Sequence, residues 1–184
     1  MDITIRKGTE KDAKGVIEVN TFTWLTTYKG LISNQILEKR IETMDKRVVR
    51  IIDEIKKYNN LYVALDNKKV VGMMMYGKSR NTNYPDSGEI YAIYVLDNYQ
   101  GLGIGKKLFM LGIKELINLG FNSMILNVLD GNKAISFYQK YGGIKKEIIQ
   151  EQYCNTNLTE HIIYFDNLNK IYSEFFNNEE TKKL

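Results

Sequence analysis

The feature that most constrains this chain is a run of strand-forming residues that leads directly into three closely spaced glycines. Residues 89–96 carry the aromatic and β-branched side chains typical of a buried strand. Gly101, Gly103 and Gly105 follow, and a helical pattern of apolar residues begins at the same point. Glycine lets a backbone turn sharply and approach a ligand closely. The segment therefore predicts a strand, a tight turn and a helix in immediate succession.

This turn is suited to a phosphate group. The first N–H groups of a helix have no partner within the helix, and the helix dipole adds partial positive charge there, so phosphate oxygens are favoured at that end. Lys106 and Lys107 lie in the first turn, where positive side chains oppose the dipole. A bound anion explains their position better than helix stability does.

Two familiar glycine motifs do not fit the turn. The dinucleotide fingerprint Gly-x-Gly-x-x-Gly places its third glycine later than Gly105. The mononucleotide P-loop requires Ser or Thr after Gly-Lys, and here Lys107 follows Lys106. A nucleotide-binding module that uses this turn for ATP or NAD is therefore a weak alternative.

The motif that fits is Gln/Arg-x-x-Gly-x-Gly/Ala, present as residues 100–105. In this motif the chain resembles the Gcn5-related N-acetyltransferase (GNAT) superfamily. A second segment, residues 132–143, is similar to the family pattern Asn-x-x-Ala-x-x-Phe-Tyr-x-Lys-x-Gly-Phe and follows in the right order. The resemblance covers residues 88–144, with weaker patterning on both sides.

The resemblance implies acetyl-CoA as the acetyl-donor cosubstrate and no metal. In the family the glycine motif holds the pyrophosphate, and the end of the preceding strand pairs with the pantetheine arm. The positions that the resemblance assigns to the cofactor are Ile93, Tyr94, Val95, Gln100, Gly101, Leu102, Gly103, Ile104, Gly105, Lys106, Asn132 and Tyr138. A single cysteine and a single histidine also give no zinc-site spacing.

The predicted elements agree with the family's α/β fold, a mixed and mostly antiparallel sheet with helices on both faces and a splayed parallel strand pair. The parallel strands are those that end at Val95 and Val128. The strands are predicted at residues 3–7, 61–65, 70–76, 89–96, 123–129, 144–153 and 159–165, and the helices at 12–24, 33–58 with a break near 44, 103–119, 133–141 and 168–176.

The implied reaction is transfer of the acetyl group to a primary amine by direct attack in a ternary complex. An amine with a pKa of about 10.4 is mostly protonated at neutral pH, so a proton acceptor is useful. Tyr138 occupies the position of the family's tyrosine and is the candidate acid for the leaving thiolate. The alternative is that Phe137 and Tyr138 form an aromatic pair in the core.

Glu89 is the candidate base, at the spacing of the catalytic glutamate in the histone-acetyltransferase branch. The alternative is a solvated residue at the start of a strand. The branch that acetylates ribosomal-protein N-termini carries a glutamate on the fifth strand, but residues 124–128 offer only Asn127. That mechanism is therefore not expected.

Two departures from the family pattern affect the second segment. Asn132 stands six residues before Tyr138, where the family has seven, and Gly131 occupies the usual place. Where the family pattern ends in Gly-Phe, this chain has Gly142-Gly143. The second glycine lacks the aromatic side chain that would pack there, but the turn is kept.

The sequence constrains the amine acceptor least. It leaves open an amine of a small molecule, of a peptide or of a protein. The family lines this site with segments that correspond to residues 21–30 and 153–157. Trp24 and Tyr28 are the candidate substrate-binding residues, as an aromatic wall for a cation. Alternatively, both belong to the core.

Composition is consistent with one enzyme domain over residues 1–176 and a frayed tail over 177–184. Of the 184 residues, 43% are hydrophobic and 26% charged, which is ordinary for a globular protein. No apolar run approaches the roughly 20 residues of a membrane span, and no secretory signal is evident, so we expect a cytoplasmic protein. The net charge of +4 is scattered, which predicts no nucleic-acid or membrane partner and leaves a homodimer open. A non-catalytic acyl-CoA-binding sensor with the same fold is the alternative function.

Overall fold

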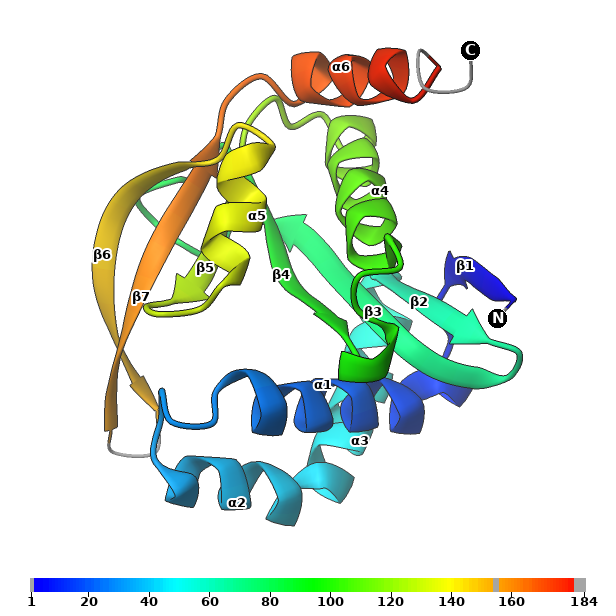
Figure 1. The fold of residues 1–184 in the computed structure, drawn as a ribbon, viewed down its shortest axis with the longest axis vertical. Coiled ribbons are helices and arrows are strands. Elements are labelled where there is room, and N and C mark those ends of the chain that lie inside the picture. Colours follow the sequence, from blue (N-terminus) through cyan, green and yellow to red (C-terminus); the bar gives the residue numbers. More distant parts are fainter. Residues whose placement is uncertain (1, 154–155, 181–184) are drawn as a thin grey trace. The chain divides into compact units, whose positions relative to one another are not determined.

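A computed structural model of the chain describes residues 2–153 and 156–180 (Figure 1). Short 3-10 turns precede α1 (Glu10–Asp12) and α4 (Asp97–Tyr99). The elements in chain order are β1 (Ile3–Lys7), α1 (Ala13–Thr27), α2 (Asn34–Glu42), α3 (Met44–Tyr58), β2 (Leu61–Asp66), β3 (Lys69–Lys78), β4 (Gly88–Val95), α4 (Ile104–Asn118), β5 (Met124–Leu129), α5 (Ala134–Lys140), β6 (Ile144–Tyr153), β7 (Thr156–Phe165) and α6 (Leu168–Glu180).

The predicted order of elements is confirmed, although several elements begin or end a few residues away from the predicted positions. The helical region predicted for residues 33–58 divides at Thr43, close to the expected break. The last helix runs on to Glu180 and so takes in part of the segment expected as a tail. The last four positions, 181–184, lie outside the described residues.

The strands form one seven-stranded sheet in the order β1-β2-β3-β4-β5-β7-β6. The pairs β1–β2, β2–β3 and β5–β7 are antiparallel, and β4–β5 is parallel. The parallel pairing joins Gly88 to Met124 and Glu89 to Ile125 and does not continue along the described remainder of the two strands. This is the splayed parallel pair that the resemblance implied, and the fold class is confirmed.

The chain forms two compact units, and β3 and β4 each pass from one to the other. The first unit comprises Met1–Met75, Ala92–Phe109 and Tyr153–Thr156, and the second comprises Tyr76–Tyr91, Met110–Gln152 and Asn157–Leu184. The single-domain assignment of residues 1–176 stays a prediction.

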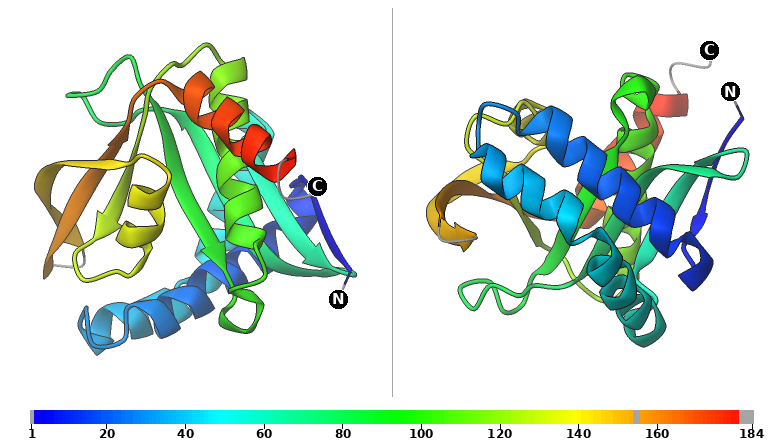
Figure 2. Two further views of the ribbon diagram at one scale, coloured as in Figure 1. Left: turned by 45° about the horizontal axis from the view of Figure 1, so that its top comes forward. Right: turned by 90° about the horizontal axis from the view of Figure 1, so that it is seen from below.

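The first unit is built on close packing of α1, α2 and α3. Both views of Figure 2 show α1 and α2 side by side, and α1 also contacts α3. At Gly15 of α1, an added Cβ would lie 2.7 Å from Val70 Cγ2, so the glycine is what allows the helix to approach β3. The core residues of this unit include Val16, Val19, Leu61, Val63, Met74, Leu108 and Phe109.

The second unit has a core between α5, β5 and β7, with Leu116 of α4. Its fully buried side chains include Leu116, Met124, Ile125, Ile162, Ile163 and Phe165. At Gly143, which follows α5, an added Cβ would lie 2.7 Å from both Ile163 Cγ2 and Phe165 Cζ. Phe165 thus fills the space beside this glycine, and no aromatic residue is needed at position 143.

Candidate active site

The glycine turn lies between the end of β4 and the start of α4. Gly101 and Gly103 have φ angles of 75° and 78°, in the left-handed region that residues with a side chain rarely adopt. A Cβ added to either glycine would meet no other atom within 4 Å. The described part of the protein therefore leaves the space over these two residues unfilled. The turn combines the geometry and the room that a phosphate group requires.

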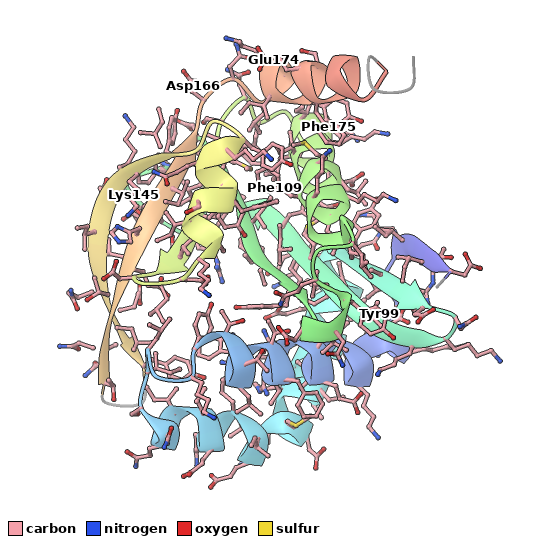
Figure 3. All side chains as sticks on the ribbon, in the orientation of Figure 1. Tyr99, Phe109, Lys145, Asp166, Glu174 and Phe175 are labelled. Carbon is pink, nitrogen blue, oxygen red and sulfur yellow. The ribbon has the colours of Figure 1, made fainter. Side chains whose placement is uncertain are left out.

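Neighbouring contacts hold the turn in place. The Gln100 side-chain amide donates to the Val95 carbonyl oxygen at 3.0 Å, which ties the turn to the end of β4. The Tyr99 hydroxyl, labelled in Figure 3, donates to Asp66 Oδ2 at 3.1 Å on the β2–β3 hairpin, and this hydrogen bond raises the Tyr99 pKa. Ile104, which is only 3% exposed, anchors the first turn of α4 in the core.

The end of β4 is also connected to α1. Tyr94 Oη accepts a hydrogen bond from Trp24 Nε1 at 2.9 Å. The Val95 carbonyl oxygen accepts from Thr23 Oγ1 at 3.5 Å as well as from Gln100. Since a carbonyl oxygen has two lone pairs, that of Val95 is already satisfied within the protein.

Trp24 and Tyr28 contact each other, and Trp24 also contacts Arg40. Their rings meet edge to face at 4.7 Å, and Tyr28 is buried. The guanidinium carbon of Arg40 lies 3.6 Å from the centre of the Trp24 ring. One face of Trp24 is therefore covered by a cation of the protein itself. The substrate-binding role of both aromatic residues stays a prediction.

Glu89 is buried, contrary to the alternative of a solvated strand-start residue. Its side chain is 5% exposed and its carboxylate accepts three hydrogen bonds from Arg80. The donors are the backbone N–H at 2.7 Å, Nε at 3.1 Å and Nη2 at 2.5 Å. This ion pair offsets the penalty of burying a carboxylate. The proposed role as a base stays a prediction.

Glu160 is a second carboxylate on the same face of the sheet, and the sequence reading missed it. Glu89 pairs with Ile125, Asn127 lies two residues further along β5, and Glu160 of β7 pairs with Leu129. Residues paired across strands, and those two apart along a strand, share a face. Asn127 donates a hydrogen bond to Glu160, so a carboxylate lies beside the fifth strand although that strand has none.

The pKa of Glu160 is raised, first by burial and then by the charges of Glu151 and Glu89. The hydrogen bond from Asn127 and the charge of Arg80 act in the opposite direction. The sequence contains one signal for this residue, because Glu160 alternates with Ile162 and Tyr164 on one face of a strand. That signal could be interpreted only once β7 was known to lie beside β5, because this pairing is what brings Glu160 next to the fifth strand.

Tyr138 lies on α5 and is 9% exposed. Its ring meets that of Phe137 edge to face at 5.2 Å, so the aromatic pair named as the alternative does form. Its role as an acid stays a prediction. Asn132 Oδ1 accepts from the N–H of Ala134, the first residue of α5, at 2.9 Å, and Gly131 has a φ of 78°. The cofactor role of Asn132 is likewise a prediction.

Comparison with known proteins identifies the family of this chain. The family model described as Acetyltransferase (GNAT) family matches residues 24–143. The chain belongs to this family. It is 32% identical, over 76% of its length and 79% of the relative's, to the uncharacterized N-acetyltransferase YuaI of Bacillus subtilis.

Solved structures of the GNAT type share the fold. The PaiA N-acetyltransferase of Thermoplasma acidophilum, in complex with coenzyme A, superposes with a TM-score of 0.72 at 22% identity, over 90% of this chain and 99% of that one. The acetyltransferase yncA of Salmonella typhimurium, with acetyl-CoA, gives 0.66 at 19% identity, over 89% and 93%. These structures show the fold, and membership of the acetyltransferase family, with the 32% identical relative, supports acetyl transfer as the class of reaction. Within the described part of the chain, every helix is too short or too polar to cross a membrane.

Proposed function

We propose that this chain is an acetyl-CoA-dependent N-acetyltransferase that acts on a primary amine of a small molecule, a peptide or a protein. The observation that carries the proposal is the turn of residues 100–106. Its two left-handed glycines face open space at the start of α4, directly after the strand whose pairing with β5 stops at Glu89. Backbone N–H groups of this turn, with Lys106, hold the pyrophosphate of the donor.

In the proposed reaction the amine nitrogen attacks the thioester carbon and the carbon–sulfur bond breaks. The departing thiolate takes a proton from the Tyr138 hydroxyl, and a carboxylate accepts the proton lost by the amine. Glu89 is the proposed acceptor. Glu160 is a second candidate, because it lies on the same face and is not held in the ion pair that occupies Glu89.

The test is the release of free thiol from acetyl-CoA over a panel of amines and peptides. Turnover is expected with at least one class of amine. Removal of a general acid lowers catalysis by about 100-fold to 10,000-fold, so Tyr138→Phe should lose most of kcat while the KM for acetyl-CoA changes little. A melting curve of the variant checks that the buried side chain still packs.

Two other functions make different predictions. A non-catalytic acyl-CoA sensor would bind the coenzyme without turnover of any amine, and Tyr138→Phe would change nothing measurable. A nucleotide-binding module would let ATP or NAD displace coenzyme A in a competition experiment. Binding of coenzyme A that neither nucleotide displaces, together with amine-dependent thiol release, would rule out both.

A further inference from the structure

Two arginines of the first unit lie close together, and neither has an acidic partner among the residues that the structure describes. Arg40 of α2 is 7% exposed, and Arg47 of α3 is half-buried. Arg47 Nη2 donates to the carbonyl oxygen of Arg40 at 2.8 Å. Both helices that carry them contact α1, and Figure 2 shows α2 beside it.

The other partners of this pair are neutral. Arg40 Nη1 donates to the Tyr153 hydroxyl at 2.9 Å, and Arg40 Nη2 donates to Asn20 Oδ1. Arg47 Nη1 donates to the same Asn20 oxygen at 2.8 Å, and Arg47 Nη2 donates to Thr21 Oγ1. None of these groups carries a negative charge.

The pair is therefore a partly buried positive charge with no counter-charge in the described part of the chain. Among the described residues, no carboxylate lies within ion-pair distance of either guanidinium, and the Nε atoms of both are buried without a hydrogen-bond partner. Burial, and then repulsion from Arg40, lower the Arg47 pKa to about 10. The Trp24 ring attracts the Arg40 cation but has no net charge to neutralise it. Buried charges in proteins normally have a counter-charge.

We propose that Arg40 and Arg47 bind an oxyanion, a carboxylate or a phosphate, on the molecule that receives the acetyl group. Guanidinium groups suit this ligand because their planar donors match two oxygens of one anion. The cluster reaches the surface, since Asn20, Trp24 and Tyr153 around it are only half-buried. This inference rests on the proposed function, because it specifies the class of acceptor.

Trp24 connects the arginine pair to β4, the strand that is proposed to bind the acetyl donor. Its ring covers Arg40 on one side, and its Nε1 donates to the Tyr94 hydroxyl of β4. The oxyanion subsite is therefore linked by one side chain to the strand that is proposed to hold the pantetheine arm. An acceptor with both an amine and an oxyanion fits this arrangement better than a polyamine, because the cation on Trp24 is already part of the protein.

The first test measures binding without catalysis. Sulfate is titrated into the protein in the presence and absence of saturating coenzyme A, at constant ionic strength, and the melting temperature is followed. Arg47→Gln should weaken the saturable effect of sulfate by about tenfold or more, since it removes one of two guanidinium groups. Arg50→Gln, which removes an exposed charge from the same helix, should leave it unchanged. Equal responses of the two variants, or no saturable effect in the wild type, would overturn the inference.

The second test compares three acceptors in thiol release, namely an amino acid, its amide and an aminoalkyl phosphate. We expect kcat/KM in the wild type to favour one of the two anionic acceptors over the amide by about tenfold or more, and Arg47→Gln to remove the preference. The favoured anion identifies carboxylate or phosphate. Turnover without a preference would refute the oxyanion subsite alone, whereas no turnover with any amine would refute the proposed function. Because the wild-type preference is measured directly, the test does not depend on the folding of the variant.

Discussion

Asp12 organises the beginning of α1 with a single carboxylate. It accepts hydrogen bonds from Arg6 at 2.8 and 2.9 Å and from the Thr9 N–H and hydroxyl at 2.7 and 2.9 Å. Thr9 and Asp12 stand three residues apart, which is the spacing of a helix-capping pair and is visible in the sequence. Arg6 could not be predicted, because the partner comes from β1 and depends on how the strand leads into the helix.

The hydrogen bonds from Arg6 are the main cause of the lowered pKa of Asp12. A carboxylate with a lowered pKa stabilises the fold above its unfolded value of about 3.9, and this stabilisation is lost as the pH falls through the folded value. Asp12→Asn should therefore lose about 1–2 kcal/mol of unfolding free energy at neutral pH. The loss should shrink in acid, as measured by urea unfolding.

The exposed Asp53 of α3 provides the control for this prediction. Asp53→Asn should stay within about 0.5 kcal/mol of the wild type at either pH. A loss in Asp12→Asn that is the same at neutral pH and in acid would show that the charge of Asp12 is not what stabilises the fold.

The two carboxylates of the second unit can be assigned by their effects on rate. If Glu89 is the base, Glu89→Gln should lower kcat about 100-fold and remove the acid limb of the pH–rate profile. Glu160→Gln should then have a smaller effect. The reverse order would move the role to Glu160, whose raised pKa would place its acid limb above that of an ordinary glutamate. An unchanged acid limb in both variants would exclude both residues.

At the scale of elements, the periodic segments were predictable and the contacts between them were not. Apolar spacing and the positions of glycine located every strand and helix, because these signals lie within each segment. The cluster around Arg40 joins α1, α2, α3 and the end of β6, with partners such as Asn20 and Tyr153 far apart in the chain. Pairing of β7 with β5 also placed Glu160 where local patterning alone could not.

The packing of α5 against β7 makes a testable prediction at Gly143. An alanine Cβ would lie 2.7 Å from Ile163 and Phe165 and 2.9 Å from the Tyr138 carbonyl oxygen, and the last contact is with backbone that cannot rotate away. Gly143→Ala should therefore destabilise the protein by about 1–3 kcal/mol in urea unfolding.

Gly105 of α4 is the matched control, because its added Cβ would come no closer than 3.9 Å to Val95. Gly105→Ala should be neutral or stabilise the protein by up to about 1 kcal/mol, since alanine favours a helix. If Gly143→Ala proved as stable as the wild type, the close approach of α5 to β7 would be wrong.

At the scale of the whole molecule, the account depends on one continuous sheet in which the parallel pairing of β4 with β5 ends after Glu89. Family membership and the fold followed from the glycine motif and the second segment in their order along the chain. The amine acceptor did not, because side chains from several separate elements line such a site. The proposed oxyanion subsite is the structure's contribution to that question.

Ligand binding should stabilise the whole chain. A ligand that binds only the folded state raises its stability by about 2.7 kcal/mol at 100 times its dissociation constant. Coenzyme A is therefore expected to raise the melting temperature of the wild type. If a variant no longer shows this rise in melting temperature, the substituted residue contributes to coenzyme A binding.

The most direct test is calorimetric titration of coenzyme A into the wild type, Gly103→Leu and Gly120→Leu. Gly103 and Gly120 have φ angles of 78° and 91°, and an added Cβ would meet nothing within 4 Å at either, so the backbone strain of the two substitutions is matched. The wild type and Gly120→Leu should bind coenzyme A, and Gly103→Leu should bind about tenfold more weakly or not at all, since the side chain would occupy the proposed place of the pyrophosphate. Equal affinity of Gly103→Leu and the wild type, or no binding by the wild type, would contradict the assignment of this turn.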